Sequence, residues 1–294
     1  MSITRNLVSS SLDLSSSSKA IHPSATFLMC PPKFYAVNYV INAWMEGNLH
    51  ASSQVQAAEQ WQCLYEAVKQ VANIVLVEPQ PGSPDMVFTA NAGLERNGVI
   101  VLSSFFHPER QSEEQHFRHW FQTAGYTVVS IPREISFEGE GDALFAMEGT
   151  RLWAGYGTRT QHSSHHYLSE ALNLEVVSLH LIDPHFYHLD TCFAPLQSGC
   201  VMYYPPAFDD VSIKKIEAYY PIEKRIIVSE ADALHFACNV INVGRTIILN
   251  EIGKELRDHL REIGFNVIEV PLGEFLKAGG AAKCLVMKLS KGSR

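Results

Sequence analysis

The sequence predicts an α/β fold in which one unit, a helix plus about three strands, repeats five times around an axis like the blades of a propeller. Five amphipathic helical stretches begin at intervals of about 45 to 60 residues, a spacing typical of propeller repeats. Short apolar runs fill the intervals, at roughly three for each helix. A doubly wound α/β sheet is the alternative, but no G-x-G-x-x-G or phosphate-loop glycine pattern follows any strand.

The helical stretches cover residues 51–71, 109–124, 163–172, 206–219 and 253–263. Val55, Leu64 and Val68 of the first recur at helical spacing and would face the core. The expected strands are 27–30, 74–77, 87–90, 99–102, 127–131, 144–147, 152–154, 176–179, 201–204, 225–228, 240–243, 246–249, 267–270 and 285–288.

The composition indicates one large core. Hydrophobic residues make up 46% of the chain, with 15 Phe and 11 Tyr, so residues 25–294 are expected to form a single domain. Residues 1–24 are rich in serine and lack apolar periodicity, which predicts a disordered tail. No apolar stretch is long enough to span a membrane and no secretory leader is evident, so a cytoplasmic protein is expected.

Charge and cysteine usage narrow the function classes. The formal charge is −8 and no run of Lys or Arg occurs, which argues against nucleic acid and suits a small cationic substrate. The six cysteines show no C-x-x-C pairing, so neither a zinc site nor a disulfide framework is predicted. We expect five buried thiols and one reactive one.

The reactive thiol is expected at Cys284, because a flexible loop containing Gly279 and Gly280 leads into it. A buried structural thiol is the alternative for this residue alone. Upstream, the run 186–193 reads as a strand that places His188 and Asp190 on one face. A glycine-rich turn over 137–144 adds three carboxylates, of which Glu140 may simply face solvent. A thiol, an imidazole and several carboxylates, each next to the end of a predicted strand, together predict an active site.

His162, His165 and His166 have the spacing of metal ligands on a helix. Because Ser163 or Ser164 would cap that helix, these histidines are expected on its exposed first turn. The sequence therefore predicts no metal site and no cofactor.

Several segments carry a family resemblance: 27–32 (FLMCPP), 41–45 (INAWM), 84–93 (PDMVFTANAG) and 107–110 (HPER). With the Cys284 and His188 motifs, they make the chain resemble the guanidino-modifying superfamily of arginine deiminases, dimethylargininases and amidinotransferases. The similarity spans about residues 26–288 and is greatest to the catalytic domain of cyanobacterial-type arginine dihydrolases. It implies the pentein fold, a five-bladed α/β propeller.

The chain departs from the family pattern in three places. Deiminases have a longer glycine run before the cysteine, where this chain has Ala281, Ala282 and Lys283. The family's Asn-Pro-Trp reads Asn42-Ala43-Trp44 here. The large second domain of the cyanobacterial enzymes has no counterpart in these 294 residues.

The resemblance also implies the chemistry. Cys284 would attack the guanidinium carbon, and His188 would protonate the leaving nitrogen and then activate water. Asp142 and Asp190 would bind the guanidinium, with Asp190 also favouring the charged imidazole.

Substrate binding is implied for six further residues. Arg110 and Arg159 would clamp the substrate carboxylate. Asn42 and Asn91 would contact the guanidino end, and Glu138 and Ala278 would complete the site.

The expected function is hydrolysis of L-arginine to ornithine, ammonia and carbon dioxide by an arginine dihydrolase, because neutral amides can serve both a guanidinium and a ureido group. An arginine deiminase or dimethylargininase that stops at citrulline is the alternative enzyme. A non-catalytic binding module of the same fold is the alternative from another class. The expected partner is the small substrate, with assembly into a homo-oligomer.

Overall fold

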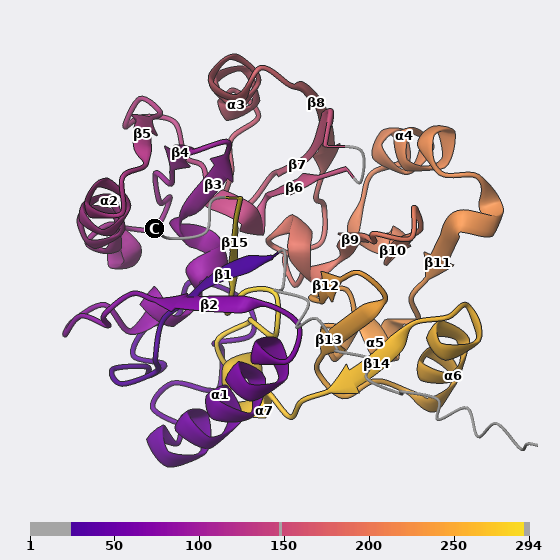
Figure 1. The fold of residues 1–294 in the computed structure, drawn as a ribbon, viewed down its shortest axis with the longest axis horizontal. Coiled ribbons are helices and arrows are strands. Elements are labelled where there is room, and N and C mark those ends of the chain that lie inside the picture. Colours follow the sequence, from indigo (N-terminus) through magenta and orange to yellow (C-terminus); the bar gives the residue numbers. More distant parts are fainter. Residues whose placement is uncertain (1–24, 147–148, 291–294) are drawn as a thin grey trace, which may run out of the picture.

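The computed structural model describes residues 25–146 and 149–290, so the predicted tail at 1–24 lies outside the described residues. Five three-stranded sheets are arranged in a ring, with the larger helices at its periphery (Figure 1). The predicted repeat of one helix and three strands is thus confirmed for the described residues.

Each sheet follows the same β-β-α-β order. In the unit formed by β3 (Gly93–Arg96), β4 (Val99–Leu102), α2 (Glu113–Thr123) and β5 (Thr127–Ser130), β3 pairs with β4 antiparallel and β4 pairs with β5 parallel. A parallel pair needs a long crossover connection, and the helix supplies it.

Three further units repeat this order. They are β6 (Ala143–Phe145), β7 (Arg151–Tyr156), α3 (Ser164–Leu172) and β8 (Glu175–His180); β9 (Phe193–Pro195), β10 (Val201–Tyr203), α4 (Asp210–Tyr219) and β11 (Arg225–Ile227); and β12 (Ile241–Val243), β13 (Thr246–Leu249), α6 (Lys254–Glu262) and β14 (Asn266–Glu269). Two short helices, α5 (Glu230–Leu234) and α7 (Gly273–Leu276), lie in connections.

The fifth sheet joins the two ends of the described chain. β15 (Met287–Leu289) pairs antiparallel with β1 (Thr26–Met29), which pairs parallel with β2 (Asn73–Leu76) after the crossover helix α1 (Gln54–Lys69). This sheet closes the ring (Figure 1).

Apolar packing holds each helix against its sheet. Phe117 and Phe121 of α2 pack with Ile100 and Leu102 of β4, and all four side chains are buried. Burying one such side chain stabilises the fold by about 1.5–3 kcal/mol. The helix starts are also specified locally, because the Asp209 carboxylate caps α4 by accepting the Ser212 N–H at 2.8 Å.

All five predicted helices are present but shorter than expected. The strand predicted at 87–90 is wrong: residues Pro84–Val87 and Thr89–Ala92 form two 3-10 turns, and β3 begins only at Gly93. Backbone hydrogen bonds close these turns, such as that from the Phe88 N–H to the Asp85 carbonyl at 2.9 Å, and the Thr89 hydroxyl donates to the Leu28 carbonyl of β1 at 2.9 Å. The strand reading of 186–193 is also wrong, because Leu189–Thr191 is a 3-10 turn.

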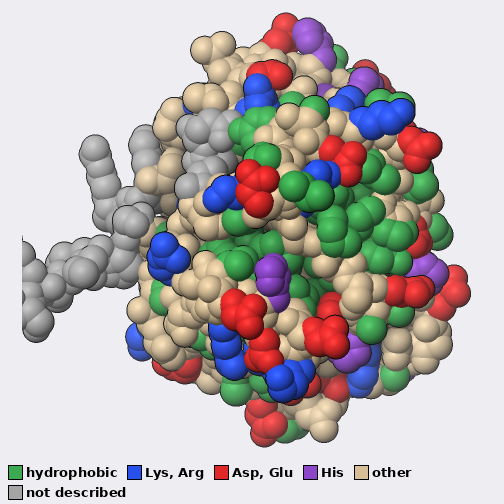
Figure 2. Space-filling model, turned by 90° about the vertical axis from the view of Figure 1, so that its right-hand side faces the viewer, with side chains coloured by type: hydrophobic (Ala, Val, Ile, Leu, Met, Phe, Trp, Pro, Cys, Tyr) green, Lys and Arg blue, Asp and Glu red, His purple; other side chains and the backbone are tan. Residues whose placement is uncertain are grey.

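Figure 2 shows the side of the molecule that carries α4 and β11, where basic side chains are scattered among acidic ones around an apolar area. Within the described ranges, no helix has the length and apolar character needed to cross a membrane.

Candidate active site

The site residues occupy equivalent places in the five units, just before the first strand of each sheet. Asn91, Asp142, Asp190, Asn239 and Cys284 precede β3, β6, β9, β12 and β15. Because a ring of repeats brings equivalent positions to its axis, residues about 50 positions apart in sequence meet at one place.

One group of side chains is centred on Glu138. Its Oε2 accepts hydrogen bonds from Arg159 Nη1 at 2.9 Å and from His188 Nε2 at 2.8 Å. Thr160 links this carboxylate's segment to Asp142, because its hydroxyl accepts the Glu138 N–H at 3.1 Å and donates to Asp142 Oδ2 at 2.6 Å. Asp142 Oδ2 also lies 3.9 Å from His188 Nε2.

The pKa values of the two carboxylates in this group, Glu138 and Asp142, are shifted in opposite directions. Burial alone would raise the pKa of Glu138, but the Arg159 guanidinium and the His188 hydrogen bond hold it well below its ordinary range. Burial raises the pKa of Asp142 to about 6, although His188 and Thr160 partly offset the rise. The imidazole thus has a firmly ionised partner in Glu138.

A second group is centred on Cys284. Its Sγ lies 3.5 Å from Asp190 Oδ2 and 3.1 Å from Asn239 Nδ2. Asn239 Oδ1 also accepts the Cys284 N–H at 3.0 Å, and Asn239 Nδ2 donates to the Asp190 carbonyl at 3.1 Å. Burial, followed by the Asp190 charge, raises the pKa of the Cys284 thiol far above its ordinary value. Burial also raises the pKa of Asp190 to about 7.

Both groups border a small enclosed pocket. The described residues that line it are Ile41, Asn42, Met45, Asp85, Phe88, Asn91, Arg110, Arg159, Tyr187, Ala278, Gly279, Gly280 and Cys284. The structure therefore brings Asn42, Asn91, Arg110, Arg159 and Ala278 close to Cys284, whereas four other predicted site residues do not line this pocket: Glu138, Asp142, His188 and Asp190.

The two arginines that line the pocket, Arg110 and Arg159, differ in how many guanidinium N–H donors are already used by the protein. Arg110 makes a two-pronged bond to the Glu113 carboxylate, at 2.9 and 2.8 Å, and donates to Asn91 Oδ1 at 2.8 Å. Arg159 packs its guanidinium 4.6 Å from the centre of the Tyr187 ring, and its buried Nε has no hydrogen-bond partner among the described residues. Arg159 is therefore the better candidate for a ligand carboxylate.

The Asn42 amide is occupied by the chain itself. Its Nδ2 donates to the Ala278 carbonyl at 3.0 Å, and its Oδ1 accepts the Trp44 N–H at 2.9 Å. Asn42 thereby fixes the loop that precedes Cys284.

Two glycines are required by this geometry. Gly279 has φ +83°, in the left-handed region, and its carbonyl accepts the Tyr187 hydroxyl at 2.6 Å. A Cβ at Gly141 would lie 2.4 Å from Asn91 Nδ2 and 3.1 Å from His188 Nδ1. The lack of a side chain at Gly141 thus lets the Asn91 amide and the His188 imidazole pack closely against its backbone.

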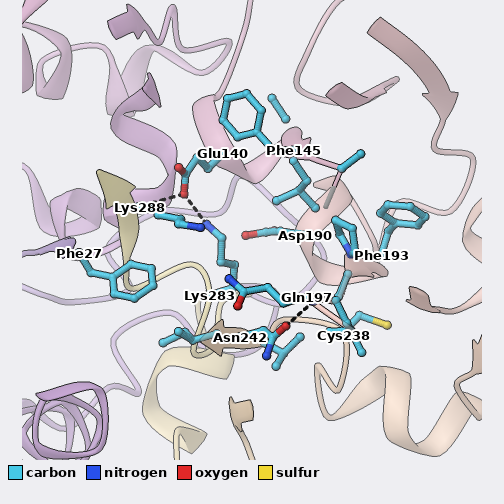
Figure 3. Close-up of a pocket in the computed structure, with 18 residues that line it drawn as sticks. Phe27, Glu140, Phe145, Asp190, Phe193, Gln197, Cys238, Asn242, Lys283 and Lys288 are labelled. Atoms are coloured by element: carbon cyan, nitrogen blue, oxygen red, sulfur yellow. Dashed lines mark hydrogen bonds and ion pairs between the residues drawn. The ribbon is translucent and has the colours of Figure 1, made fainter. Parts of the chain in front are cut away.

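A second, larger cavity shares Asp190 with this site (Figure 3). Lys283 crosses it and donates to Glu140 Oε2 at 2.7 Å, while Gln197 and Asn242 lie in its wall. Asp190 Oδ1, on the carboxylate that contacts Cys284, is buried without a hydrogen-bond partner among the described residues.

Four sequence-based expectations need correction. Asp190 contacts the thiol rather than the imidazole, because the turn after His188 sends the two side chains apart. Glu140 is buried in its ion pair with Lys283. Cys63 is exposed, so four cysteines besides Cys284 are buried. His165 is buried and bonds with Ser178, so it does not lie on an exposed turn.

Sequence reasoning missed Asn239. Its signal was positional: it precedes β12 as Cys284 precedes β15, and the chain has an equivalent polar residue about every 50 positions. Among the described residues, no group of three or more His, Cys, Asp and Glu side chains is arranged to hold a metal ion.

The sequence family described as eukaryotic N,N dimethylarginine dimethylhydrolase matches residues 33–291. The bifunctional arginine dihydrolase/ornithine cyclodeaminase ArgZ of Synechocystis is 56% identical over 90% of this chain and 37% of its own length. The related AgrE of Nostoc is 55% identical over 90% of this chain and 38% of its own length. This chain thus spans less than two fifths of these relatives. The dimethylarginine dimethylaminohydrolase of Mycobacterium tuberculosis is 39% identical over 90% of this chain and 85% of its own length.

Solved structures show the same likeness. The N-terminal domain of ArgZ, as a cysteine-to-serine variant bound to its substrate, is 56% identical with a TM-score of 0.89, covering 90% of this chain and 97% of that domain. An asparagine-to-serine variant of that domain, with the same identity, coverage and TM-score, is covalently bonded to a reaction intermediate. A dimethylarginine dimethylaminohydrolase with 20% identity and a TM-score of 0.76, covering 90% of this chain and 98% of that one, shares the fold.

Proposed function

Because the chain belongs to the N,N dimethylarginine dimethylhydrolase family, we propose that it is a cysteine-dependent guanidino hydrolase, and specifically an arginine dihydrolase. The observation that carries this proposal is the pocket in which Cys284 lies among Asn91, Arg110 and Arg159. The likeness to the ArgZ domain supports arginine as the substrate. We also propose that the five sheets are the blades of a pentein-type α/β propeller.

The pocket can hold L-arginine at both ends. Arg159, with its unpartnered Nε, would receive the substrate carboxylate. Asp190 and Asp142 would hold the guanidinium beside Sγ. Arg110 would act through Asn91, because its bond to Asn91 Oδ1 fixes the amide, whose nitrogen donates to the Glu138 carbonyl at 3.3 Å.

A bound substrate would lower the pKa of the Cys284 thiol. Burial and the Asp190 charge raise this pKa, whereas a bound guanidinium next to sulfur would offset the Asp190 charge. The nucleophile would therefore ionise when its cationic substrate is in place.

In the first half of the reaction, an S–C bond forms between Cys284 and the guanidinium carbon and a C–N bond breaks. His188 donates the proton with which ammonia leaves, then takes a proton from the water that cleaves the S–C bond. Glu138 stabilises the imidazolium before the first of these proton transfers and after the second, and orients the neutral imidazole between them. A second, equivalent cycle on the ureido group releases another ammonia, and the carbamate that follows loses carbon dioxide to give ornithine, with two waters consumed overall.

The family description keeps a second candidate open, a dimethylargininase or deiminase that stops after the first cycle. Incubation with L-arginine separates the two. Ornithine with two ammonia per arginine is expected, and citrulline as the only product would overturn the dihydrolase reading. Cys63→Ser, which alters the exposed cysteine, is the matched control for Cys284→Ser.

Cytoplasmic location and homo-oligomer formation stay proposals. The large hydrophobic side chains Val211 of α4 and Ile227 of β11 are exposed, which supports self-association through this unit. Sedimentation of the purified protein tests the oligomer.

A further inference from the structure

We infer that Asn239 is a further catalytic residue, whose side-chain N–H stabilises the Cys284 thiolate while its carbonyl oxygen holds the backbone of the nucleophile. The inference rests on the proposed function only in taking Cys284 as the nucleophile.

The hydrogen bonds fix the orientation of the Asn239 amide. The Cys284 N–H can only donate, and it lies 3.0 Å from Asn239 Oδ1. The Asp190 carbonyl can only accept, and it lies 3.1 Å from Asn239 Nδ2. The oxygen and nitrogen of the amide therefore cannot be exchanged, and the nitrogen is the atom 3.1 Å from Sγ.

The Asn239 amide nitrogen carries two hydrogens, and each faces a hydrogen-bond acceptor. One serves the Asp190 carbonyl, and the other faces sulfur. Sulfur accepts such a bond weakly as a thiol and strongly as a thiolate, because bonds to ionised acceptors are about twice as strong as neutral ones. Asn239 is completely buried, so water does not compete for this N–H.

The charged groups around Cys284 leave this role to a neutral donor. Lys283 is tied to Glu140, and across the pocket Arg110 and Arg159 are tied to Glu113 and Glu138. Asp190 and Asp85 are acidic, Tyr187 donates to a carbonyl, and His188 is bonded to Glu138 with Asp142 behind it. The thiol itself donates to Asp190, and the Asn239 amide donates to sulfur. A backbone hydrogen bond from Ala281, the Asn239 amide and the Lys283 charge each lower the pKa of the thiol, and among them Asn239 is the donor that a side-chain substitution can remove.

Asn239 also connects segments, and a test must separate this from an effect on sulfur. Its own carbonyl accepts the Lys283 N–H at 3.3 Å, so its backbone and side chain hold consecutive residues, Lys283 and Cys284. Asn250 provides a matched control. It is a buried asparagine of the same unit whose amide donates to the His235 carbonyl at 3.1 Å and accepts the Leu272 N–H at 3.0 Å.

The experiment compares the thiolate fraction of Cys284 between proteins without substrate. The rate at which iodoacetamide alkylates Cys284 is measured at one fixed pH, as the difference between each protein and its Cys284→Ser counterpart, because the thiolate is the reacting form. Asn239→Ala removes the donor and adds no charge, whereas Asn239→Asp keeps an oxygen for the Cys284 N–H but adds a carboxyl group whose charge acts in the same direction. Asn239→Ala should lower the alkylation rate about ten- to hundredfold, the worth of one hydrogen bond to a charged group. Asn250→Ala should leave the rate unchanged.

An unchanged alkylation rate in folded Asn239→Ala, or an equal fall in Asn250→Ala, would overturn the inference. If Asn239→Ala does not fold, the wild-type protein labelled with ¹⁵N decides. Its Asn239 side-chain resonance should move as alkaline pH begins to ionise the thiol and stay still in Cys284→Ser, and a resonance that does not move refutes the role. Because no turnover is measured, an enzyme inactive on arginine would leave this result interpretable.

Discussion

Replacing Asp190 with asparagine should stabilise the protein while abolishing its activity. The Asp190 carboxylate is buried, and its Oδ1 has no hydrogen-bond partner among the described residues. Burial raises its pKa from 3.8 to about 7, so the folded protein binds a proton that the unfolded chain releases. Stability therefore falls as pH rises from about 4 to about 7, and the deficit persists above that range.

The size of the effect follows from the shift. About three pKa units correspond to about 4 kcal/mol, which is the most that removing the charge can return at about pH 8. At about pH 4.5 the same linkage leaves a gain of only about 1 kcal/mol, because the folded carboxyl is neutral there and the pH is less than one unit above the ordinary pKa of the unfolded carboxyl.

Urea unfolding of Asp190→Asn and wild type at these two pH values measures the difference. Asp209→Asn is the control of opposite sign, since hydrogen bonds from Ser212 lower the pKa of Asp209 against its small burial, and its charge stabilises the fold above about pH 4. An Asp190→Asn protein that is less stable than wild type at about pH 8 would refute the assignment of Asp190 as a strained, functional charge.

Four further outcomes are expected. Cys284→Ser should bind L-arginine but lose turnover, and calorimetry with a kinetic assay checks this; more than about a tenth of wild-type turnover would contradict covalent catalysis. Agmatine, which lacks the carboxylate, should lose about two orders of magnitude in kcat/KM because Arg159 would stay unsatisfied, and equal rates would exclude the clamp. Treatment with EDTA should leave activity unchanged; loss that one metal restores would contradict the metal-free chemistry. Lys283→Met should cost about 3–5 kcal/mol of unfolding free energy by leaving Glu140 buried and unpaired, whereas a cost below 1 kcal/mol would mean that water replaces the ammonium.

The repeat and the presence of Cys284 in a pocket could be predicted from the sequence because both depend on patterns along the chain. Helical periodicity located all five crossover helices, and the glycine loop indicated Cys284. The pairing of side chains could not be predicted in this way. Residues two apart in a turn do not face each other, so the His188 side chain hydrogen-bonds with Glu138 whereas the Asp190 carboxylate contacts Cys284.

The strand predicted at 87–90 was wrong because apolar residues near the axis are buried in turns. Residues 87–90 are apolar enough to resemble a strand, but they are buried in turns closed by local backbone hydrogen bonds, such as that from the Asn91 N–H to the Phe88 carbonyl at 3.1 Å. Asn239 carries no local signal of catalysis, and only its register within the repeat connects it with Cys284.

The fifth sheet has a consequence for biosynthesis. β1 is among the first strands of the described chain to leave the ribosome, and all four of its residues are buried in the finished protein, yet its antiparallel partner β15 is the last strand of the described chain to be made. Until then, one edge of β1 is unpaired, and an unpaired apolar edge promotes aggregation. Cys284 reaches its place with that same segment. A nascent chain would therefore need protection of this edge until residues 287–289 have been made, and it would acquire no activity before then.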